Sequence, residues 1–193
     1  MNRAGALSER GFVVALLGAE STGKTTLSAE IGAALVERGL RVAVVGEVLR
    51  EFCDANARTP RPDEQAAIAA AQSARIEAAA ARHDVVVADT SALMIAVYSD
   101  LLFADATLYP DALAAQRHCD LTLVTALDLP WQPDGLQRDG AHVRAPVDAL
   151  LRSALADAGI TFMTIGGIGS ERVAAALRAI DAALATRSTA ARR

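Results

Sequence analysis

The motif from Gly18 to Thr25 constrains the fold of this 193-residue chain more than any other feature. Its letters, GAESTGKT, match the pattern GxxxxGK[ST]. The motif follows the apolar run 12–17 and opens a segment with helical spacing, so the chain must turn sharply from strand to helix. Glycine permits the backbone conformations that such a turn needs, and successive amide N–H groups can then face inward. We therefore expect a cradle for phosphate groups at a helix N-terminus.

The residues of this cradle differ in their expected roles. Lys24 should reach the β- and γ-phosphates of a nucleoside triphosphate, and the Thr25 hydroxyl should ligate Mg²⁺. Glu20 would repel phosphate if it pointed inward, so its side chain should point away, either toward a second substrate or to solvent. The nucleotide-binding residues expected here are Gly18, Glu20, Ser21, Thr22, Gly23, Lys24, Thr25 and Thr26.

Elsewhere the chain alternates apolar runs with longer amphipathic segments. We expect strands at 12–17, 41–46, 84–88, 121–126 and 160–165, and helices at 24–38, 63–82, 91–104, 146–158 and 170–185. Asp63 should cap the second helix. Near-continuous apolar strands separated by helices are typical of a parallel sheet covered on both faces. The sequence therefore predicts an α/β three-layer sandwich with a five-stranded parallel sheet, of the P-loop nucleoside triphosphate hydrolase or nucleoside kinase type.

Composition excludes several classes of protein. Hydrophobic residues make up 52% of the chain, which is too many for a mostly disordered protein. The apolar runs are well short of the ~20 residues that span a bilayer. A net charge of −4 disfavours nucleic-acid binding, and the two cysteines lack the spacing of zinc or disulfide frameworks. We expect a cytoplasmic protein with no nucleic-acid or membrane partner.

One domain should hold the site. We expect it to span residues 12–185, after a leader at 1–11 and before a flexible tail at 186–193. The long irregular stretch 128–145 interrupts the pattern of strands and helices. Long loops in compact domains are usually functional, so this segment is interpreted as a lid.

Two carboxylates follow strands at the edge where parallel sheets hold ligands. Asp89 ends the run 84–88 and suits the outer coordination of Mg²⁺, although it could instead cap the next helix. Glu47 could orient an acceptor hydroxyl or accept its proton. Arg50 could bind the acceptor or a phosphate, and an ion pair between Glu47 and Arg50 is the plain alternative.

The predicted lid contributes further candidates. Trp131, the only tryptophan, could stack on a cationic ring or anchor the loop to the core. Asp134 could bind ribose hydroxyls or stabilise the turn before the next glycine. Arg138 or Arg144 could bring positive charge to the transferred phosphate when the lid closes. By contrast, Tyr98 and Phe103 are expected in the core.

Four segments together resemble one family, the ribosylnicotinamide kinase domain. In chain order they are GAESTGKTT, Glu47-Val-Leu-Arg50-Glu51-Phe52, Asp89-Thr90, and Leu129-Pro130-Trp131…Asp134-Gly135-Leu136. The resemblance covers roughly residues 12–180. Such domains form the C-terminal part of bifunctional nicotinamide-mononucleotide adenylyltransferase proteins, so this chain would be a stand-alone version. The resemblance implies ATP and Mg²⁺ as cofactors and phosphorylation of nicotinamide riboside on its 5′-hydroxyl.

Two positions depart from the family pattern and leave other functions open. Ser91 stands where the family usually has aspartate, and Gln137, followed by Arg138, stands where arginine is common. A nucleotide-dependent switch or ATPase acting on a protein partner is therefore one alternative. A nucleoside monophosphate kinase is another. The arginines that could bind the phosphate of such an acceptor are Arg58, Arg61 and Arg117.

Overall fold

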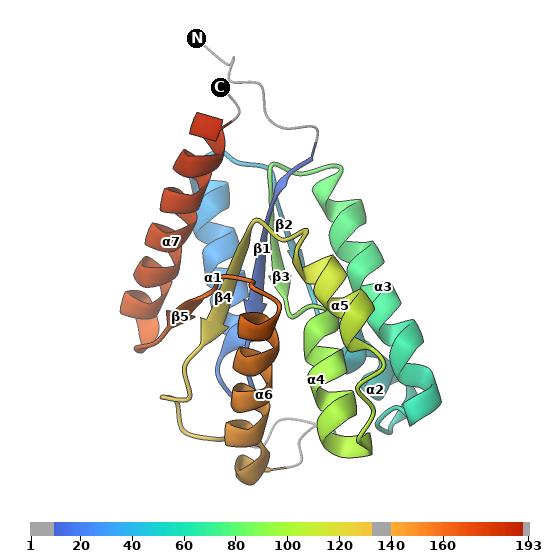
Figure 1. Ribbon diagram of the computed structural model, residues 1–193. Coiled ribbons are helices and arrows are strands. Elements are labelled where there is room, and N and C mark those ends of the chain that lie inside the picture. The colour runs from blue at the N-terminus through green and yellow to red at the C-terminus, as the bar shows by residue number, and fades with distance from the viewer. Residues whose placement is uncertain (1–9, 133–139, 191–193) are drawn as a thin grey trace.

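A sheet of five parallel strands, in the order β2-β3-β1-β4-β5, forms the centre of the molecule. The structure is a computed structural model that describes residues 10–132 and 140–190. The strands are β1 (Phe12–Leu17), β2 (Val42–Val45), β3 (Val85–Asp89), β4 (Leu121–Thr125) and β5 (Met163–Ile165). Figure 1 shows helices on both faces of this sheet, so the predicted α/β sandwich is confirmed.

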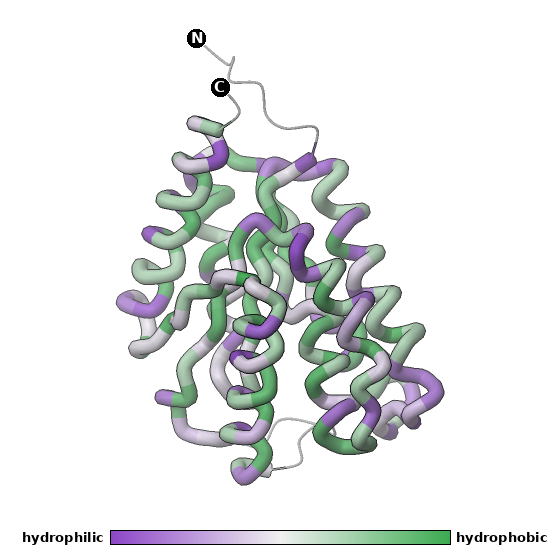
Figure 2. Tube along the Cα trace, viewed as in Figure 1, coloured by the Kyte–Doolittle hydropathy of each residue, from purple (hydrophilic) through white to green (hydrophobic). Residues whose placement is uncertain are grey.

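The helices divide between the two faces according to their apolar contacts. They are α1 (Lys24–Glu37), α2 (Val48–Asn56), α3 (Pro62–Ala80), α4 (Ala92–Phe103), α5 (Tyr109–Gln116), α6 (Arg144–Asp157) and α7 (Gly169–Ala190), with a 3-10 turn at Ala141–Val143. One core cluster joins α1 and α7 to the sheet, and another joins α3, α4, α5 and α6 to its opposite face. In Figure 2 the strands are mostly hydrophobic, whereas polar residues lie on the outer turns of the helices.

Strand β1 lies in the middle of the sheet and fixes the position of the site. All its residues are buried, which fits a continuous run of apolar side chains covered on both faces. Its register pairs Leu16 with Asp89 of β3 on one side and with Leu123 of β4 on the other. Because the strands are parallel, the segments that follow β1, β2, β3 and β4 emerge at the same edge.

Several sequence-based boundaries are corrected. The short helices α2 and α5 were not predicted. The N-cap of α3 is Arg61 rather than Asp63, because Pro62 starts the helix and the Glu64 carboxylate accepts a hydrogen bond from the Arg61 N–H at 2.8 Å. Strand β5 begins only at Met163.

The predicted flexible tail is also corrected in part, because α7 continues to Ala190. Arg187 lies in this extension, and its guanidinium is 3.2 Å from the Asp120 carboxylate and donates to the Arg10 carbonyl oxygen at 2.7 Å. These contacts fasten the last helical turns to the start of β1.

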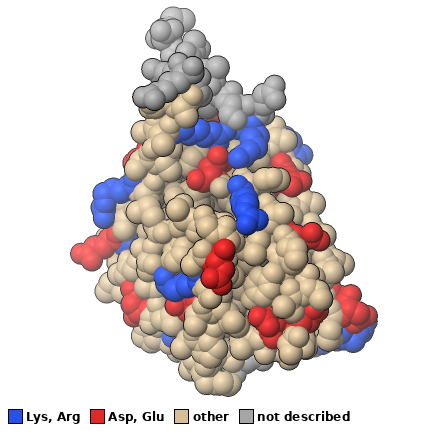
Figure 3. All heavy atoms as spheres, in the orientation of Figure 1, with Lys and Arg blue, Asp and Glu red and all other residues tan. Residues whose placement is uncertain are grey.

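The distribution of charge and the length of the helices complete the description of the fold. Figure 3 shows acidic and basic side chains interspersed over the face in view. Within residues 10–132 and 140–190, no helix is both long enough and apolar enough to cross a membrane.

Candidate functional site

The loop between β1 and α1 has the backbone conformation that its sequence predicts. Three residues adopt positive φ angles: Gly18 at 145°, Ser21 at 55° and Gly23 at 74°. The Thr22 hydroxyl donates a hydrogen bond of 2.8 Å to the Ala19 carbonyl oxygen, which closes the loop from within. The chain thus turns from a buried strand into a helix, and the first amides of α1 lie at the end of the loop. This is the geometry of a phosphate-binding P-loop.

Strand β4, which lies next to β1 in the sheet, contacts the loop through Thr125. The Thr125 hydroxyl lies 2.7 Å from the Thr22 hydroxyl and donates to the Leu17 carbonyl oxygen at 3.2 Å. A Cβ atom on residue 18 would collide with Thr125 Oγ1. Gly18 is therefore needed for two reasons, its φ angle and the close approach of β4.

A buried arginine from α7 binds the same loop at Thr22. Arg172 is 4% exposed, and its guanidinium donates to the Thr22 carbonyl oxygen at 2.9 Å and to the Gly167 carbonyl oxygen at 3.0 Å. It also lies 3.1 Å from Asp128 Oδ1. Burial raises the pKa of Asp128, but the Gly167 N–H and the Arg172 charge outweigh burial and lower that pKa overall. The P-loop, the base of the predicted lid and the turn after β5 are thereby joined.

Two cavities meet beside the P-loop. The first, the P-loop cavity, has a volume of about 550 Å³ and lies between residues 21–26 and the segment after β4, which contributes Leu129, Pro130 and Gln132. The second, the α4 cavity, has a volume of about 310 Å³ and is lined by residues from α2, α3 and α4. Lys24, Glu47 and Arg50 line both cavities.

These shared charged residues lie close together. Glu47 immediately precedes α2, and Arg50 is in its first turn. Arg50 Nε is 3.9 Å from Glu47 Oε2, so the ion pair considered from the sequence is present at the boundary of the cavities. The Lys24 ammonium donates to the Ala19 carbonyl oxygen at 2.8 Å and so lies over the P-loop.

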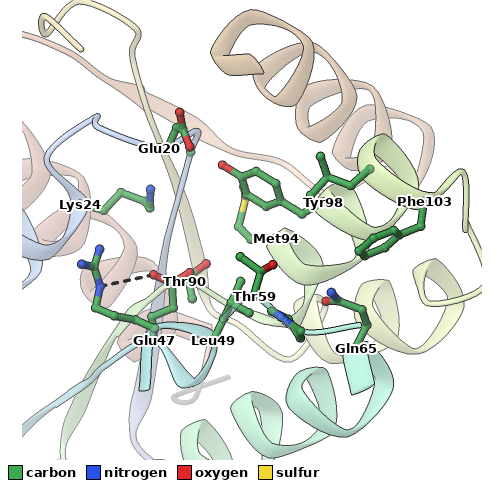
Figure 4. A pocket seen from close by; sticks show the side chains of 14 residues that line it. Glu20, Lys24, Glu47, Leu49, Thr59, Gln65, Thr90, Met94, Tyr98 and Phe103 are labelled. Atoms are coloured by element: carbon green, nitrogen blue, oxygen red, sulfur yellow. Dashed lines mark ion pairs between the residues drawn. The ribbon is translucent and has the colours of Figure 1, made fainter. Parts of the chain in front are cut away.

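The α4 cavity is apolar on one side and polar on the other. Its apolar side chains include Met94, Tyr98, Leu102 and Phe103 from α4. Tyr98 and Phe103, expected in the core, therefore line a cavity. Figure 4 shows Lys24 and Glu47 at one side of the space and Gln65 and Phe103 at the opposite side. A ligand in this cavity would place one end near the P-loop and the other between α3 and α4.

Two buried polar atoms of the α4 cavity have no hydrogen-bond partner among the described residues. They are Glu20 Oε2 and Gln65 Oε1, on side chains that are 7% and 5% exposed. The other oxygen of Glu20 accepts a 3.1 Å hydrogen bond from the indole N–H of Trp131. Buried polar atoms are normally satisfied, so both atoms indicate a ligand with hydrogen-bond donors.

The tip of β3 carries an acid and a strained residue. Asp89 is 4% exposed, and within the described residues no group donates a hydrogen bond to its carboxylate. It lines neither cavity. Thr90, which follows it, has a φ angle of 83° and lines the α4 cavity. A β-branched residue rarely adopts this conformation, and such strain is typical of functional sites.

Ser91 has a structural role in this fold. Its hydroxyl accepts a hydrogen bond from the Leu93 N–H at 3.2 Å, so Ser91 rather than Asp89 caps α4. The same hydroxyl donates to Gln116 Oε1 of α5 at 2.6 Å. Ser91 therefore faces α5 and does not line the α4 cavity.

The two residues expected to hold Mg²⁺ have suitable ligand atoms, and their role as ligands stays a prediction. Thr25 is exposed at the start of α1 and lines the P-loop cavity. Asp89 ends the neighbouring strand β3, and its carboxylate accepts no hydrogen bond from the part of the chain that the structure describes. Hydroxyl and carboxylate oxygens are the ligand types that Mg²⁺ prefers.

The structure describes only some of the candidate residues from the predicted lid, and it places them differently. Asp134, Gln137 and Arg138 lie outside the described residues. Trp131 lines neither cavity and contacts Glu20 instead, so its stacking on a ring stays a prediction. Arg144 is buried and donates to the Leu129 carbonyl oxygen at 2.9 Å, which anchors the segment after β4.

Sequence reasoning missed Gln65. One signal could have found it: Gln65 shares the buried face of α3 with Ile68, Ala69 and Ile76, where an amide is out of place. A polar residue on an apolar helical stripe needs either an internal partner or a ligand.

The fold and the loop together define a P-loop nucleotide-binding protein of the α/β class. A comparison with family models matches residues 13–172 to an AAA domain family, and the chain belongs to that family. A comparison with curated proteins gave no significant match.

Solved structures share the fold. One is "Crystal structure of NadR protein in complex with NAD and AMP-PNP", with a TM-score of 0.68 and 22% identity over 88% of this chain and 48% of that chain. Another is "Crystal structure of NadR protein in complex with NR", with a TM-score of 0.68 and 21% identity over 88% and 50% of the two chains. The chain thus spans about half the length of the chains that it matches.

Proposed function

We propose that the protein is a kinase that transfers the γ-phosphoryl group of ATP, with Mg²⁺, to the 5′-hydroxyl of a nucleoside, and that the nucleoside is nicotinamide riboside. The observation that carries the proposal is the junction of two cavities at Lys24, Glu47 and Arg50. A phosphate donor on the P-loop and an acceptor in the α4 cavity would present their reacting groups to each other at this junction. Positioning of this kind supplies much of the catalysis in phosphoryl transfer.

Each junction residue has a role that follows from its charge and place. Lys24 would neutralise negative charge on the β- and γ-phosphates. Glu47 would orient the acceptor hydroxyl and accept its proton, and Arg50 would hold Glu47 and stabilise the transferred group. When bound by Thr25 and Asp89, Mg²⁺ supplies further neutralisation of phosphate charge. Arg138, outside the described residues, stays a predicted contributor from the lid.

The charges around the α4 cavity favour a nucleoside over a nucleoside monophosphate. Arg58 donates two 2.7 Å hydrogen bonds to Glu64, and Arg61 is 3.2 Å from the same carboxylate. Neither residue lines the cavity, and Arg117 lines a different one. The cations that remain, Lys24 and Arg50, are matched by the acids Glu20 and Glu47. A second phosphate group would find no additional cation among the described residues of the lining.

The α4 cavity also supports a kinase rather than a switch that acts on a protein partner. A switch needs the P-loop but no enclosed space beside it. Here the space has unpartnered acceptor atoms on Glu20 and Gln65 and aromatic side chains on α4. Aromatic faces and a nearby carboxylate attract a flat cation, which supports the pyridinium ring of nicotinamide riboside as the ligand.

The direct test is turnover of ATP with a panel of nucleosides. Purified protein is incubated with ATP, Mg²⁺ and nicotinamide riboside, adenosine, cytidine or uridine, and ADP and phosphorylated products are measured by mass spectrometry. We expect acceptor-dependent ADP with nicotinamide riboside. ATP turnover that is indifferent to nucleosides would contradict the proposal and favour the switch.

A variant of Lys24 tests the mechanism. Lys24→Met should lower kcat at least about 100-fold, because one positioned electrostatic donor is lost. Its melting temperature should stay close to that of the wild type, since the side chain lies in the cavities and not in the core. Arg178→Met is the matched control, because Arg178 is exposed on α7 away from both cavities. Normal turnover by Lys24→Met would refute the assigned role.

A labelling experiment gives a second measure of Lys24. It is the only lysine in the sequence, so an amine-reactive label can modify only Lys24 and the N-terminal amine. ATP should protect the Lys24 peptide from modification but not the N-terminal peptide. Equal labelling with and without ATP would show that phosphates do not contact Lys24.

A further inference from the structure

We propose that Gln65 recognises a carboxamide group on the acceptor ring and makes the α4 cavity specific for a carboxamide-bearing cationic ring. The inference deepens the proposed function and rests on it. It assigns to one side chain the choice between a nicotinamide and a nicotinate riboside, which differ only in this substituent.

Gln65 lies where the ring of an acceptor would lie. It is in the first turns of α3, whereas the junction residues belong to α1 and the start of α2. Figure 4 shows Gln65 and Phe103 at the side of the cavity opposite Lys24 and Glu47. An acceptor with its 5′-hydroxyl at the junction therefore extends its ring toward Gln65.

The amide of Gln65 is buried and has a free acceptor atom in the described structure, so it can bind a ligand. Its side chain is 5% exposed, and its Oε1 has no hydrogen-bond partner in the described structure. An amide left in this state is costly, because a buried acceptor has lost its water. A ligand carboxamide would satisfy it in both directions, since its N–H can donate to Oε1 while its carbonyl oxygen accepts from Nε2.

A second glutamine on α3, Gln72, has a purely structural role and serves as a comparison. Gln72 Oε1 accepts from the Val48 N–H at 2.8 Å, and Gln72 Nε2 donates to the Gly46 carbonyl oxygen at 3.3 Å. Gln72 thus joins α3 to the segment before α2 with both ends of its amide. Gln65 makes no such bond and faces a cavity instead.

The polar groups that line the cavity favour a carboxamide over a carboxylate. A carboxylate can accept from Gln65 Nε2 but cannot donate to Oε1, so one buried acceptor stays unsatisfied. Glu20 lines the same cavity, and its negative charge would repel the carboxylate further. The pyridinium charge, in contrast, is compatible with Glu20 and with the aromatic side chains of α4.

The test compares nicotinamide riboside with nicotinic acid riboside as acceptors. The wild type should prefer the carboxamide by about tenfold or more in kcat/KM, because one buried hydrogen bond distinguishes the two. Gln65→Met keeps the size of the side chain but removes its amide. It should lower kcat/KM for nicotinamide riboside by about tenfold and reduce the preference to near unity.

Two control variants separate recognition from packing. Leu102→Ala removes apolar lining from the same cavity and should weaken both acceptors equally. Gln72→Met should lower the melting temperature because it breaks the two bonds to the backbone, while the preference stays at its wild-type value. If Gln65→Met leaves the preference unchanged while the wild type still phosphorylates nicotinamide riboside, the role of Gln65 is wrong and the kinase proposal stands.

A binding measurement covers the case in which turnover is absent. Calorimetry of the wild type and Gln65→Met with each riboside, in the presence of AMP-PNP, measures recognition without chemistry. Selective loss of nicotinamide riboside affinity in Gln65→Met supports the inference even then. Failure of the wild type to bind either riboside overturns the inference together with the proposed acceptor. Circular dichroism confirms that each variant is folded.

Discussion

At the scale of single residues, positive φ angles in non-glycine residues occur in two places, at helix ends and at the candidate site. Four non-glycine residues among those described have positive φ angles. Ala57 and Ala104 end α2 and α4 in the left-handed conformation that often closes a helix. Ser21 and Thr90 have no such role, and they line the P-loop cavity and the α4 cavity. Backbone strain outside helix ends therefore lies at the candidate site, in agreement with the general tendency.

The hydrogen bond between Trp131 and Glu20 leads to a prediction about acceptor binding. Trp131→Phe removes the N–H that lies 3.1 Å from Glu20 Oε1 but keeps an aromatic ring. We expect the KM for the acceptor to rise about fivefold, because Glu20 is no longer held, while the KM for ATP is unchanged. Steady-state kinetics with each substrate varied in turn measure both values. If Trp131→Phe behaves as the wild type and only Trp131→Ala is impaired, the ring itself contacts the acceptor, as the sequence suggested.

At the scale of elements, the close contact between the P-loop and β4 predicts that adding a methyl group at position 18 lowers the free energy of unfolding. Gly18→Ala places a Cβ against Thr125 Oγ1 at a φ angle of 145°. Overpacking in a tightly packed region costs about 1–3 kcal/mol, and backbone strain adds to this. The free energy of unfolding, measured with urea, should fall accordingly.

The matched control for this substitution is Gly39→Ala. Gly39 also has a positive φ angle, 83°, but a Cβ there would meet no atom within 4 Å. Its destabilisation therefore reports backbone strain alone, at about 1–2 kcal/mol. A smaller loss for Gly18→Ala than for Gly39→Ala would show that β4 does not press on the loop.

The N-terminus of α3 gives a prediction about pH. Hydrogen bonds from Arg58 lower the pKa of Glu64 from its ordinary value of 4.5 to about 2, and the Arg61 N–H contributes to the same shift. A lowered pKa means that the folded state favours the carboxylate, so this stabilisation is complete above pH 4.5 and is lost between pH 4.5 and pH 2. The difference in melting temperature between the wild type and Glu64→Gln should be largest at pH 7 and shrink toward pH 2. A difference that stays constant over this range would contradict the role of the ion pair.

The elements that sequence analysis found and those that it missed differ in length and pattern. Strand β1 was bounded correctly because a continuous apolar run between a glycine and the P-loop has few alternatives. Helices α2 and α5 have nine and eight residues, too few for a clear period of apolar positions. The cap of α3 was misplaced because proline and the Glu64 side chain, rather than Asp63, define its start.

At the scale of the whole molecule, the sheet explains why part of the site could be predicted. Lys24, Glu47 and Asp89 each follow a parallel strand, so topology alone brings them to one edge. Gln65 and Tyr98 depend instead on the rotation of α3 and α4 about their axes. That rotation is set by packing between helices, which no local pattern specifies. The phosphate side of the site was therefore open to prediction from topology, whereas on the opposite side the only signal was the amide of Gln65 on the apolar face of α3.

Arg172 connects parts of the molecule that are distant in sequence, and its loss should affect both stability and nucleotide binding. Arg172→Met removes the bonds to the Thr22 and Gly167 carbonyl oxygens and leaves Asp128 without its cation. Breaking a buried pair costs about 3–5 kcal/mol, and because Asp128 is 36% exposed we expect a loss of about 2–3 kcal/mol. ATP affinity should fall by about tenfold or more, since the hydrogen bond from Arg172 to the Thr22 carbonyl oxygen no longer fixes the P-loop.

Asp128→Asn distinguishes the charge of this network from its contact with the loop. The variant removes the negative partner of Arg172, but it leaves the bond from Arg172 to the Thr22 carbonyl oxygen in place. It should therefore lower the free energy of unfolding while ATP affinity, measured by calorimetry, stays near the wild-type value. Arg172→Lys keeps the charge without the forked geometry, so it should bind ATP more weakly than Asp128→Asn does. If Arg172→Met and Asp128→Asn weaken ATP binding to the same extent, general destabilisation rather than the hold on Thr22 explains the effect.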